Sequence, residues 1–344
     1  ESESRGLGDV YKRQLLFGIP IPILDGYCIN KCDFSPHYGE NKVYTQALPS
    51  LVWYSLRKNT SEGGRMEDRE INGTVFSEFG EKTAPAIILI HGLGLNKDVW
   101  QWQVAALSQH HRVVSYDLFG HAKSKAPPAT PSLKLFADQT QTLMNYTGIE
   151  NATVIGFSLG GMIARRIAQD APQRVNSLVI LHSPHQRSAA AQRAILDRVA
   201  QAREQGSAAT VEAALERWFT APFRHKNPKL MELVRAWVLD NKQDIYHTIY
   251  QVLATGIDEI TNPTPAISCP ALVVTGDEDF GNGPDMARAI ANDINGAELH
   301  ILNGLRHMAL AENPAAVTQP ILRFLTSHLR TPIPRQSAQG DAHD

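Results

Sequence analysis

Cysteine is scarce in this chain. Its 344 residues include only Cys28, Cys32 and Cys269, which are too few to form a disulfide framework. We therefore predict a reducing compartment, the cytoplasm. Cys28 and Cys32 have a spacing that would suit a metal, but no second pair of Cys or His residues lies nearby in the sequence. Metal sites of this kind need about four protein ligands, so we predict no metal site there.

A large net charge and long apolar runs are also lacking. The formal net charge is -2 at pH 7, which gives no electrostatic reason to expect binding to nucleic acid or to an acidic membrane surface. The apolar run LLFGIPIPIL (15–24) is too short to span a bilayer, and Pro20 and Pro22 break it. An export signal is the alternative, since Lys12-Arg13 precedes the run, but no small-residue cleavage site follows.

The two ends differ in character from the rest of the chain. Residues 1–65 show no sustained period, and we expect them to be a non-native or disordered extension before a natural start at Met66. From Met66 onward, MEDREINGTVFSEFGEK predicts a short strand pair around Asn72-Gly73, a dipeptide typical of hairpin turns. Residues 330–344 are polar and contain proline, so we predict a disordered tail.

Short apolar runs alternate with helical patterns after Met66. The runs are AIILIHG (86–92), RVVSYD (112–117), ATVIGFS (152–158), SLVILHS (177–183), ALVVTG (271–276) and AELHIL (297–302). Runs so rich in Val, Ile and Leu are typical of parallel strands buried on both faces. The alternation predicts an α/β fold with a mostly parallel, doubly wound sheet. It stops at 184–267, where only helices are expected, so we predict a helical cap inserted into a core of 66–183 and 268–329.

A serine stands between glycines where one of these strands ends. Gly156-Phe157-Ser158-Leu159-Gly160 matches the pattern G-x-S-x-G, after a predicted strand and before a predicted helix. In that context the pattern forms a sharp turn that raises the serine hydroxyl above the edge of the sheet. Ser158 is therefore the predicted nucleophile.

A serine nucleophile needs a base, and the base needs an acceptor that orients it. His307 follows the last predicted strand, in a loop at the strand's carboxyl end, whereas other histidines lie within helical, connecting or strand segments. The strand ALVVTG leads into Asp277-Glu278-Asp279. We favour Asp279 as the acceptor because it leaves room for the loop to turn back over the sheet, with Asp277 as the alternative.

Two backbone N–H groups complete the expected site. His91-Gly92-Leu93-Gly94 follows a predicted strand, and its glycines let a backbone N–H point toward the serine. The N–H groups of Leu93 and Leu159 are the predicted oxyanion donors. His91 itself is expected to be structural.

Five motifs together resemble those of α/β-hydrolase fold enzymes. They are HGLG (91–94), YDLFGH (116–121), GFSLGG (156–161), TGDED (275–279) and GLRHM (304–308). The order Ser, Asp, His along the chain is also that of this family. The family usually has Gly-Arg where this chain has Ala122-Lys123, but that loop is structural. Residues 216–224 resemble the start of the cap in 3-oxoadipate enol-lactonases, and we expect Trp218 and Phe219 to contact the substrate.

The resemblance implies a serine hydrolase that cleaves a small-molecule carboxylic ester or lactone, such as an enol-lactone, through an acyl-enzyme and without a cofactor. A serine at position 158 argues against haloalkane dehalogenases and epoxide hydrolases, which use an aspartate there. One alternative is hydrolysis of a carbon–carbon bond in a ring-cleavage diketone. The other is a non-catalytic ligand receptor on the same fold.

Overall fold

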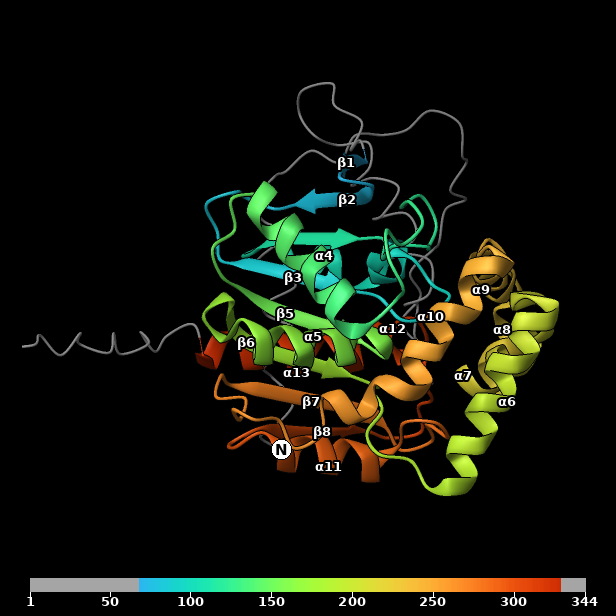
Figure 1. Cartoon of the computed structure of the whole chain (residues 1–344). Coiled ribbons are helices and arrows are strands. Elements are labelled where there is room, and N and C mark those ends of the chain that lie inside the picture. Colours follow the sequence, from blue (N-terminus) through green and yellow to red (C-terminus); the bar gives the residue numbers. More distant parts are fainter. Residues whose placement is uncertain (1–67, 329–344) are drawn as a thin grey trace, which may run out of the picture. The chain divides into compact units, whose positions relative to one another are not determined.

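The computed structural model describes residues 68–328, which form an eight-stranded sheet with helices on both faces (Figure 1). The predictions for residues 1–65 and 330–344, including Cys28 and Cys32, lie outside the described residues. Within 68–328, no helix is both long and apolar enough to cross a membrane.

The sheet is mostly parallel, as the sequence predicts. Its spatial order is β1-β2-β4-β3-β5-β6-β7-β8, and only the pairs β1–β2 and β2–β4 are antiparallel. The strands are β1 (Arg69–Ile71), β2 (Thr74–Phe79), β3 (Ala86–Ile90), β4 (Arg112–Tyr116), β5 (Ala152–Phe157), β6 (Val175–Leu181), β7 (Ala271–Gly276) and β8 (Glu298–Leu302). Each predicted run forms a strand. Asn72 and Gly73 form the predicted hairpin turn, with φ values of 49° and 83°.

Helices cover both faces of the sheet, which explains why its strands are continuously apolar. One face carries α4 (Leu133–Tyr146), α5 (Leu159–Asp170) and α11 (Pro284–Asp293); the other carries η1 (Lys97–Trp102), α3 (Val104–Leu107), α12 (Ala309–Glu312) and α13 (Pro314–His328). Successive strand residues point to opposite faces. In β3, Ile88 and Ile90 pack in the α4–α5 layer, whereas Ile87 and Leu89 pack in the layer that contains α13.

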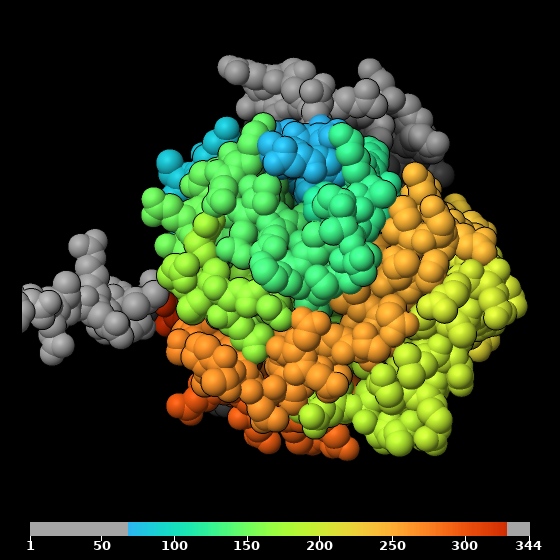
Figure 2. Space-filling model, viewed as in Figure 1, coloured from blue at the N-terminus to red at the C-terminus, as the bar shows by residue number. Residues whose placement is uncertain are grey.

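Between β6 and β7 the described chain forms only helices. They are α6 (Ala189–Gln205), η3 (Ser207–Ala209), α7 (Val211–Trp218), α8 (Ala221–Lys226), α9 (Pro228–Leu239), α10 (Gln243–Thr255) and η4 (Gly256–Glu259). In Figure 1, α6 to α10 lie on the side of the sheet where the carboxyl ends of the parallel strands are found. Gly120 lies so close to α10 that an added Cβ would be 2.6 Å from Ile245 and 2.8 Å from Ile249. On the face shown in Figure 2, these helices (yellow to orange) form one continuous surface with the neighbouring green segments.

Two glycines allow β5, α5 and β3 to approach one another closely. A Cβ on Gly156 would lie 2.1 Å from the carbonyl oxygen of Gly160, and a Cβ on Gly160 would lie 2.1 Å from that of Ile90. Both obstacles are backbone atoms, which cannot move aside as a flexible side chain can. The turn that carries Ser158 therefore depends on glycine at both positions.

Replacing Gly160 with Ala should destabilise the fold, because its methyl group would collide with the backbone of β3. We expect the free energy of unfolding, measured with urea, to fall by at least about 2 kcal/mol. The matched control is Gly281→Ala, since among residues 68–328 a Cβ at Gly281 would have only one neighbour within 4 Å, at 3.8 Å. Equal stability of the two variants would show that the strand and helix can separate at little cost.

Candidate active site

Ser158 occupies the strained turn between β5 and α5. Its φ of 55° and ψ of -114° lie in a region that non-glycine residues rarely adopt. The backbone N–H of Ser158 donates to the Leu181 carbonyl at 2.8 Å, and the Ser158 carbonyl accepts from the Ser183 hydroxyl at 3.0 Å. These bonds hold the strained turn against β6. The side chain is largely buried and lines a pocket above the carboxyl ends of the strands.

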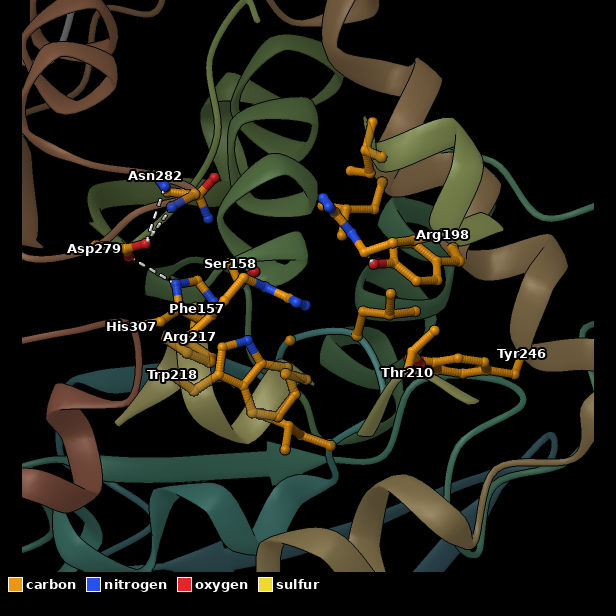
Figure 3. Close-up of a pocket in the computed structure, with 18 of the residues that line it drawn as sticks. Phe157, Ser158, Arg198, Thr210, Arg217, Trp218, Tyr246, Asp279, Asn282 and His307 are labelled. Carbon is orange, nitrogen blue, oxygen red and sulfur yellow. Dashed lines mark hydrogen bonds and ion pairs between the residues drawn. The ribbon is translucent and has the colours of Figure 1, made fainter. Parts of the chain in front are cut away.

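His307 and Asp279 line the same pocket and are joined by a hydrogen bond. Nδ1 of His307 lies 2.7 Å from Oδ2 of Asp279. In Figure 3, the His307 ring lies between Asp279 and Ser158. The other carboxylate oxygen of Asp279 accepts from the backbone N–H groups of Gly281 (3.1 Å) and Asn282 (3.0 Å). The structure thus brings together the three residues that the sequence predicts for the triad.

The carboxyl group of Asp279 is nearly fully buried and remains ionised. Burial alone would raise its pKa, but the electrostatic interaction with His307 and the hydrogen bonds from His182 and His307 hold the pKa well below its usual range. A charged acceptor fixes the tautomer of the His307 ring, with its N–H toward Asp279. The other ring nitrogen, Nε2, is then free to accept a proton.

The second aspartate in this loop, Asp277, has a different contact. Its Oδ1 accepts from the backbone N–H of Gly304 at 2.7 Å, and its own N–H donates to the Leu302 carbonyl at 2.9 Å. Asp277 therefore ties the loop after β7 to the end of β8. Of the two aspartates, Asp279 is the one that reaches His307.

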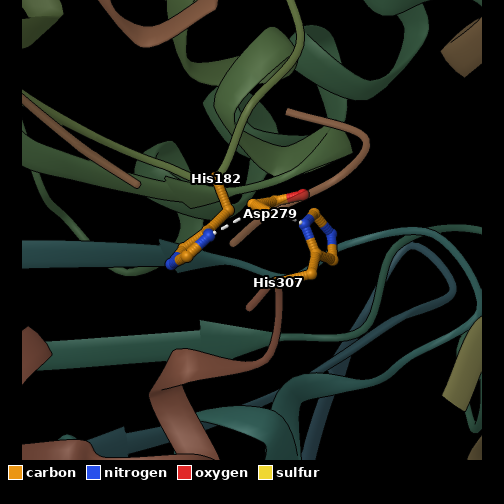
Figure 4. A group of neighbouring side chains, drawn as sticks. All are labelled: His182, Asp279 and His307. Atoms are coloured by element: carbon orange, nitrogen blue, oxygen red, sulfur yellow. Dashed lines mark hydrogen bonds and ion pairs between the residues drawn. The ribbon is translucent and has the colours of Figure 1, made fainter. Parts of the chain in front are cut away.

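A second histidine binds the same carboxylate, and no sequence motif predicted this contact. Nδ1 of His182 lies 3.0 Å from Oδ2 of Asp279, and the His182 side chain is fully buried (Figure 4). Burial, and to a lesser extent the electrostatic interaction with His307, lowers the pKa of His182, although Asp279 acts in the opposite direction. His182 therefore stays neutral and donates its Nδ1–H to the carboxylate. Its position in the sequence could have predicted this contact. His182 directly follows β6, and Asp279 follows the neighbouring parallel strand β7.

His182, Asp279 and His307 also place potential metal-ligating atoms within 4.8 Å of one another. The two Nδ1 atoms donate N–H to Asp279, and a protonated ring nitrogen has no lone pair for a metal. This group is therefore a hydrogen-bonded cluster around one carboxylate.

The predicted oxyanion donors lie on either side of Ser158. Leu159 begins α5, and Leu93 lies in the loop after β3, where a Cβ on Gly92 would be 3.1 Å from Cβ of Ser158. Within residues 68–328, neither the Leu93 nor the Leu159 backbone N–H has a hydrogen-bond acceptor. A free N–H at the start of a helix is a favourable position for an anion.

Two buried histidines shape the loop that carries Leu93. Nε2 of His91 accepts from the Leu118 N–H at 2.9 Å, and Nε2 of His121 accepts from the Gly94 N–H at 3.0 Å. Burial lowers the pKa of His91 well below its usual range and that of His121 to about 4. Both rings are thus neutral acceptors, as their backbone contacts require. The sequence predicts a structural role for His91, and its backbone contact is of that kind. The similar contact of His121 was not predicted.

The two residues predicted to contact the substrate lie in different environments. Trp218 lines the pocket, and its ring centroid lies 6.1 Å from that of His307. Phe219 does not line the pocket: its side chain is fully buried in the core and stacks on Phe223, with ring centroids 5.6 Å apart. The expectation for Phe219 is therefore corrected. The helix α7 ends at Trp218 and Phe219 is extended (φ -124°, ψ 148°), so their side chains diverge.

Comparisons with known proteins agree with this architecture. The family model described as alpha/beta hydrolase fold matches residues 85–314. The chain is 28% identical to the (E)-2-((N-methylformamido)methylene)succinate hydrolase of Acinetobacter baylyi, over 72% of this chain and 92% of that protein. It is 26% identical to 3-oxoadipate enol-lactonase 2 of the same organism, over 72% of this chain and 90% of that protein.

Solved structures show the same similarity in three dimensions. The enol-lactonase from Burkholderia xenovorans LB400 superimposes with a TM-score of 0.70 and 29% sequence identity, covering 76% of this chain and 100% of that one.

Replacing His121 should reduce the sensitivity of the fold to acid. In the unfolded chain the pKa of His121 is about 6.5, whereas in the folded protein its pKa is about 4. Between these values the unfolded chain binds more protons, so stability falls as the pH falls. We expect His121 to contribute about 2 kcal/mol of this loss between pH 8 and pH 5.

The measurement is urea unfolding at pH 8 and pH 5 for the wild type, His121→Gln and the control His110→Gln, which alters an exposed side chain. The difference in stability between the two pH values should shrink in His121→Gln and stay unchanged in the control. The same pH dependence in all three proteins would mean that His121 is not a neutral acceptor.

The two aspartates of the β7 loop should differ sharply in their effect on hydrolysis. Asp279→Asn removes the charge that orients His307 and favours the wrong ring tautomer, so kcat should fall by about 10⁴. Asp277→Asn alters only the bond to Gly304 and should cost less than tenfold. The comparison uses one activated aryl ester, after circular dichroism has shown that both variants are folded. A larger loss for Asp277→Asn would reverse the assignment.

Proposed function

The chain belongs to the α/β-hydrolase fold family, and we propose that it is a serine hydrolase that cleaves a carboxylic ester or lactone. The observation that supports this most strongly is the 2.7 Å hydrogen bond between His307 and Asp279, in a pocket that also contains the strained Ser158. A base that is oriented by a buried carboxylate next to a serine is the arrangement that activates a hydroxyl.

In the proposed reaction, Oγ of Ser158 attacks the substrate carbonyl carbon while Nε2 of His307 takes the hydroxyl proton. The negative charge that develops on the carbonyl oxygen is held by the N–H groups of Leu93 and Leu159. Each such donor is worth about 3–4 kcal/mol in the transition state. The imidazolium of His307, stabilised by Asp279, then gives its proton to the leaving alkoxide or enolate.

The acyl-enzyme is hydrolysed by the same groups in reverse order. His307 takes a proton from water, the resulting hydroxide attacks the acyl carbon, and the same two N–H groups hold the second oxyanion. The proton on His307 returns to Ser158 as the acid leaves. The reaction consumes one water and requires no group beyond these residues.

The relatives support a lactone among the candidate substrates. The names of two of them, an enol-lactonase of known structure and 3-oxoadipate enol-lactonase 2, describe lactone hydrolysis. For a lactone, the leaving oxygen remains attached to the acyl group, so the product is one ring-opened acid.

We also propose that α6 to α10 act as the cap of this site. These helices contribute Arg198, Trp218, Tyr246 and Tyr250 to the wall of the pocket that contains Ser158, and Thr210, which precedes α7, lines it as well. Walls of this kind exclude water, which strengthens the electrostatic interactions inside.

Ser158→Ala should abolish ester hydrolysis and leave the fold intact, because the lost hydroxyl contributes little packing. We expect kcat for an activated aryl ester to fall by at least about 10⁴. Ser108→Ala removes the hydroxyl of a residue that does not line the pocket. This variant is the control and should retain full activity. If Ser158→Ala kept activity within tenfold of wild type, the proposed nucleophile would be wrong.

A substrate panel separates the proposed reaction from carbon–carbon hydrolysis, which needs the same three residues. Enol-lactones, aryl esters and vinylogous diketones should be compared at equal concentration by kcat/KM. The proposal expects Ser158-dependent turnover of a lactone or ester, and preferential turnover of diketones would contradict it.

A further inference from the structure

Three arginines line the same pocket as Ser158 and His307. Arg187 precedes α6, Arg198 lies within α6, and Arg217 lies in the last turn of α7. All three are partly buried. Figure 3 shows Arg198 and Arg217 together with Trp218 and Tyr246 on the wall that the inserted helices provide. No sequence motif predicted a role for any of the three.

None of these arginines has an acidic partner within residues 68–328. Arg187 donates to the backbone carbonyls of Leu253 (3.2 Å) and Ala254 (3.3 Å). Arg198 donates through Nε to the Tyr250 hydroxyl at 3.0 Å. These neutral acceptors orient the side chains without neutralising their charges.

Of these three arginines, Arg217 has the fewest polar contacts among the described residues. Among the described residues it makes no hydrogen bond and no ion pair, although its side chain is partly buried. Of the described residues that line the pocket, only Asp279 carries a carboxylate, and its oxygens already accept four N–H groups. The pocket therefore holds an excess of positive charge.

This arrangement is electrostatically costly without a ligand. Burial, followed by repulsion from Arg198, lowers the pKa of Arg187 to about 10. Burial and the same neighbour also lower the pKa of Arg217. Arg198 thus interacts unfavourably with both other cations, and an anion in the pocket would remove that repulsion.

We propose that Arg187, Arg198 and Arg217 form a subsite for a carboxylate group of the substrate, separate from the scissile carbonyl. This inference rests on the proposed function and narrows its substrate class to esters or lactones that carry a free carboxylate. A guanidinium group presents paired N–H donors that match the two oxygens of a carboxylate. Trp218, Tyr246 and Ile195 supply apolar wall for the carbon chain between the two groups.

The test compares two nitrophenyl esters of similar size, the half-ester of glutaric acid, which carries a carboxylate, and the uncharged ester of pentanoic acid. The measured quantity is the ratio of their kcat/KM values. We expect a ratio of at least about ten for the wild type, because a charge-assisted hydrogen bond between guanidinium and carboxylate is stronger than a bond between neutral groups. Half-esters of succinic and adipic acid then give the chain length that fits best.

Arg217→Gln should lower this ratio at least tenfold, mainly through KM for the charged ester, and Arg217→Lys should restore part of it. Arg193→Gln, which removes an exposed arginine on α6 with the same change in net charge, should leave the ratio unchanged. Arg198→Gln is a second variant for the same measurement and should also lower the ratio. A wild-type ratio near one, or a ratio that Arg217→Gln leaves unchanged, would overturn the proposal.

A binding measurement keeps this result separate from the failure of the proposed hydrolysis. Calorimetric titration of glutarate into Ser158→Ala protein tests the subsite without turnover, and parallel titration of inorganic phosphate tests the other common oxyanion. We expect glutarate to bind more tightly than phosphate, and to bind at least tenfold more weakly when Arg217→Gln is added. Tighter binding of phosphate, or no binding of glutarate, would contradict a carboxylate subsite.

If no ester of either kind is hydrolysed in a Ser158-dependent reaction, the proposed function fails, while the titration still decides whether the subsite exists. Thermal unfolding adds a stability readout. Glutarate should raise the Tm of the wild type, and Arg217→Gln without ligand should not lower Tm, since it removes a repulsive charge. A clear loss of Tm in Arg217→Gln would indicate that this arginine stabilises the fold instead.

Discussion

The buried carboxylate of Asp279 accepts four N–H groups, two from imidazole rings and two from the backbone of its own loop. An ionised group in such a buried place is stable only if its oxygens are hydrogen-bonded. That requirement fixes the loop after β7, the ring of His307 after β8 and the ring of His182 after β6. The loops that follow three neighbouring strands thus all contact the carboxylate of Asp279, and these contacts determine the geometry of the site.

The opposite wall of the pocket differs from the core side in its charge. On the core side, the negative charge of Asp279 is bound by two histidines. The inserted helices and the segment before them supply Arg187, Arg198 and Arg217, which have no acidic partner among residues 68–328. Buried charge is costly when unpaired, which is why we propose that the substrate supplies the missing negative charge. In the proposed enzyme the core would carry out the chemistry, and the inserted helices would select the substrate.

The loop that carries Leu93 connects these two parts. Its Gly94 N–H donates to His121 of the core, and its Gly94 carbonyl accepts from the Asn241 side chain, between α9 and α10, at 3.0 Å. A displacement of the inserted helices would therefore act on the proposed oxyanion site through the backbone of one residue. Neutral histidines suit this task because only an unprotonated ring nitrogen can accept an N–H.

Local patterns in the sequence determined the strands, the turn at Ser158 and the positions of Asp279 and His307. Each of these depends on neighbouring residues: apolar runs make buried strands, glycines permit the turn, and strand ends place polar residues at one edge of the sheet. Tertiary structure alone decided that His182 shares the carboxylate of Asp279, that Phe219 turns away from Trp218 into the core, and that three separated arginines meet. The packing of the inserted helices against the sheet brings these groups together, and periodicity along a chain does not specify which faces of distant elements will touch.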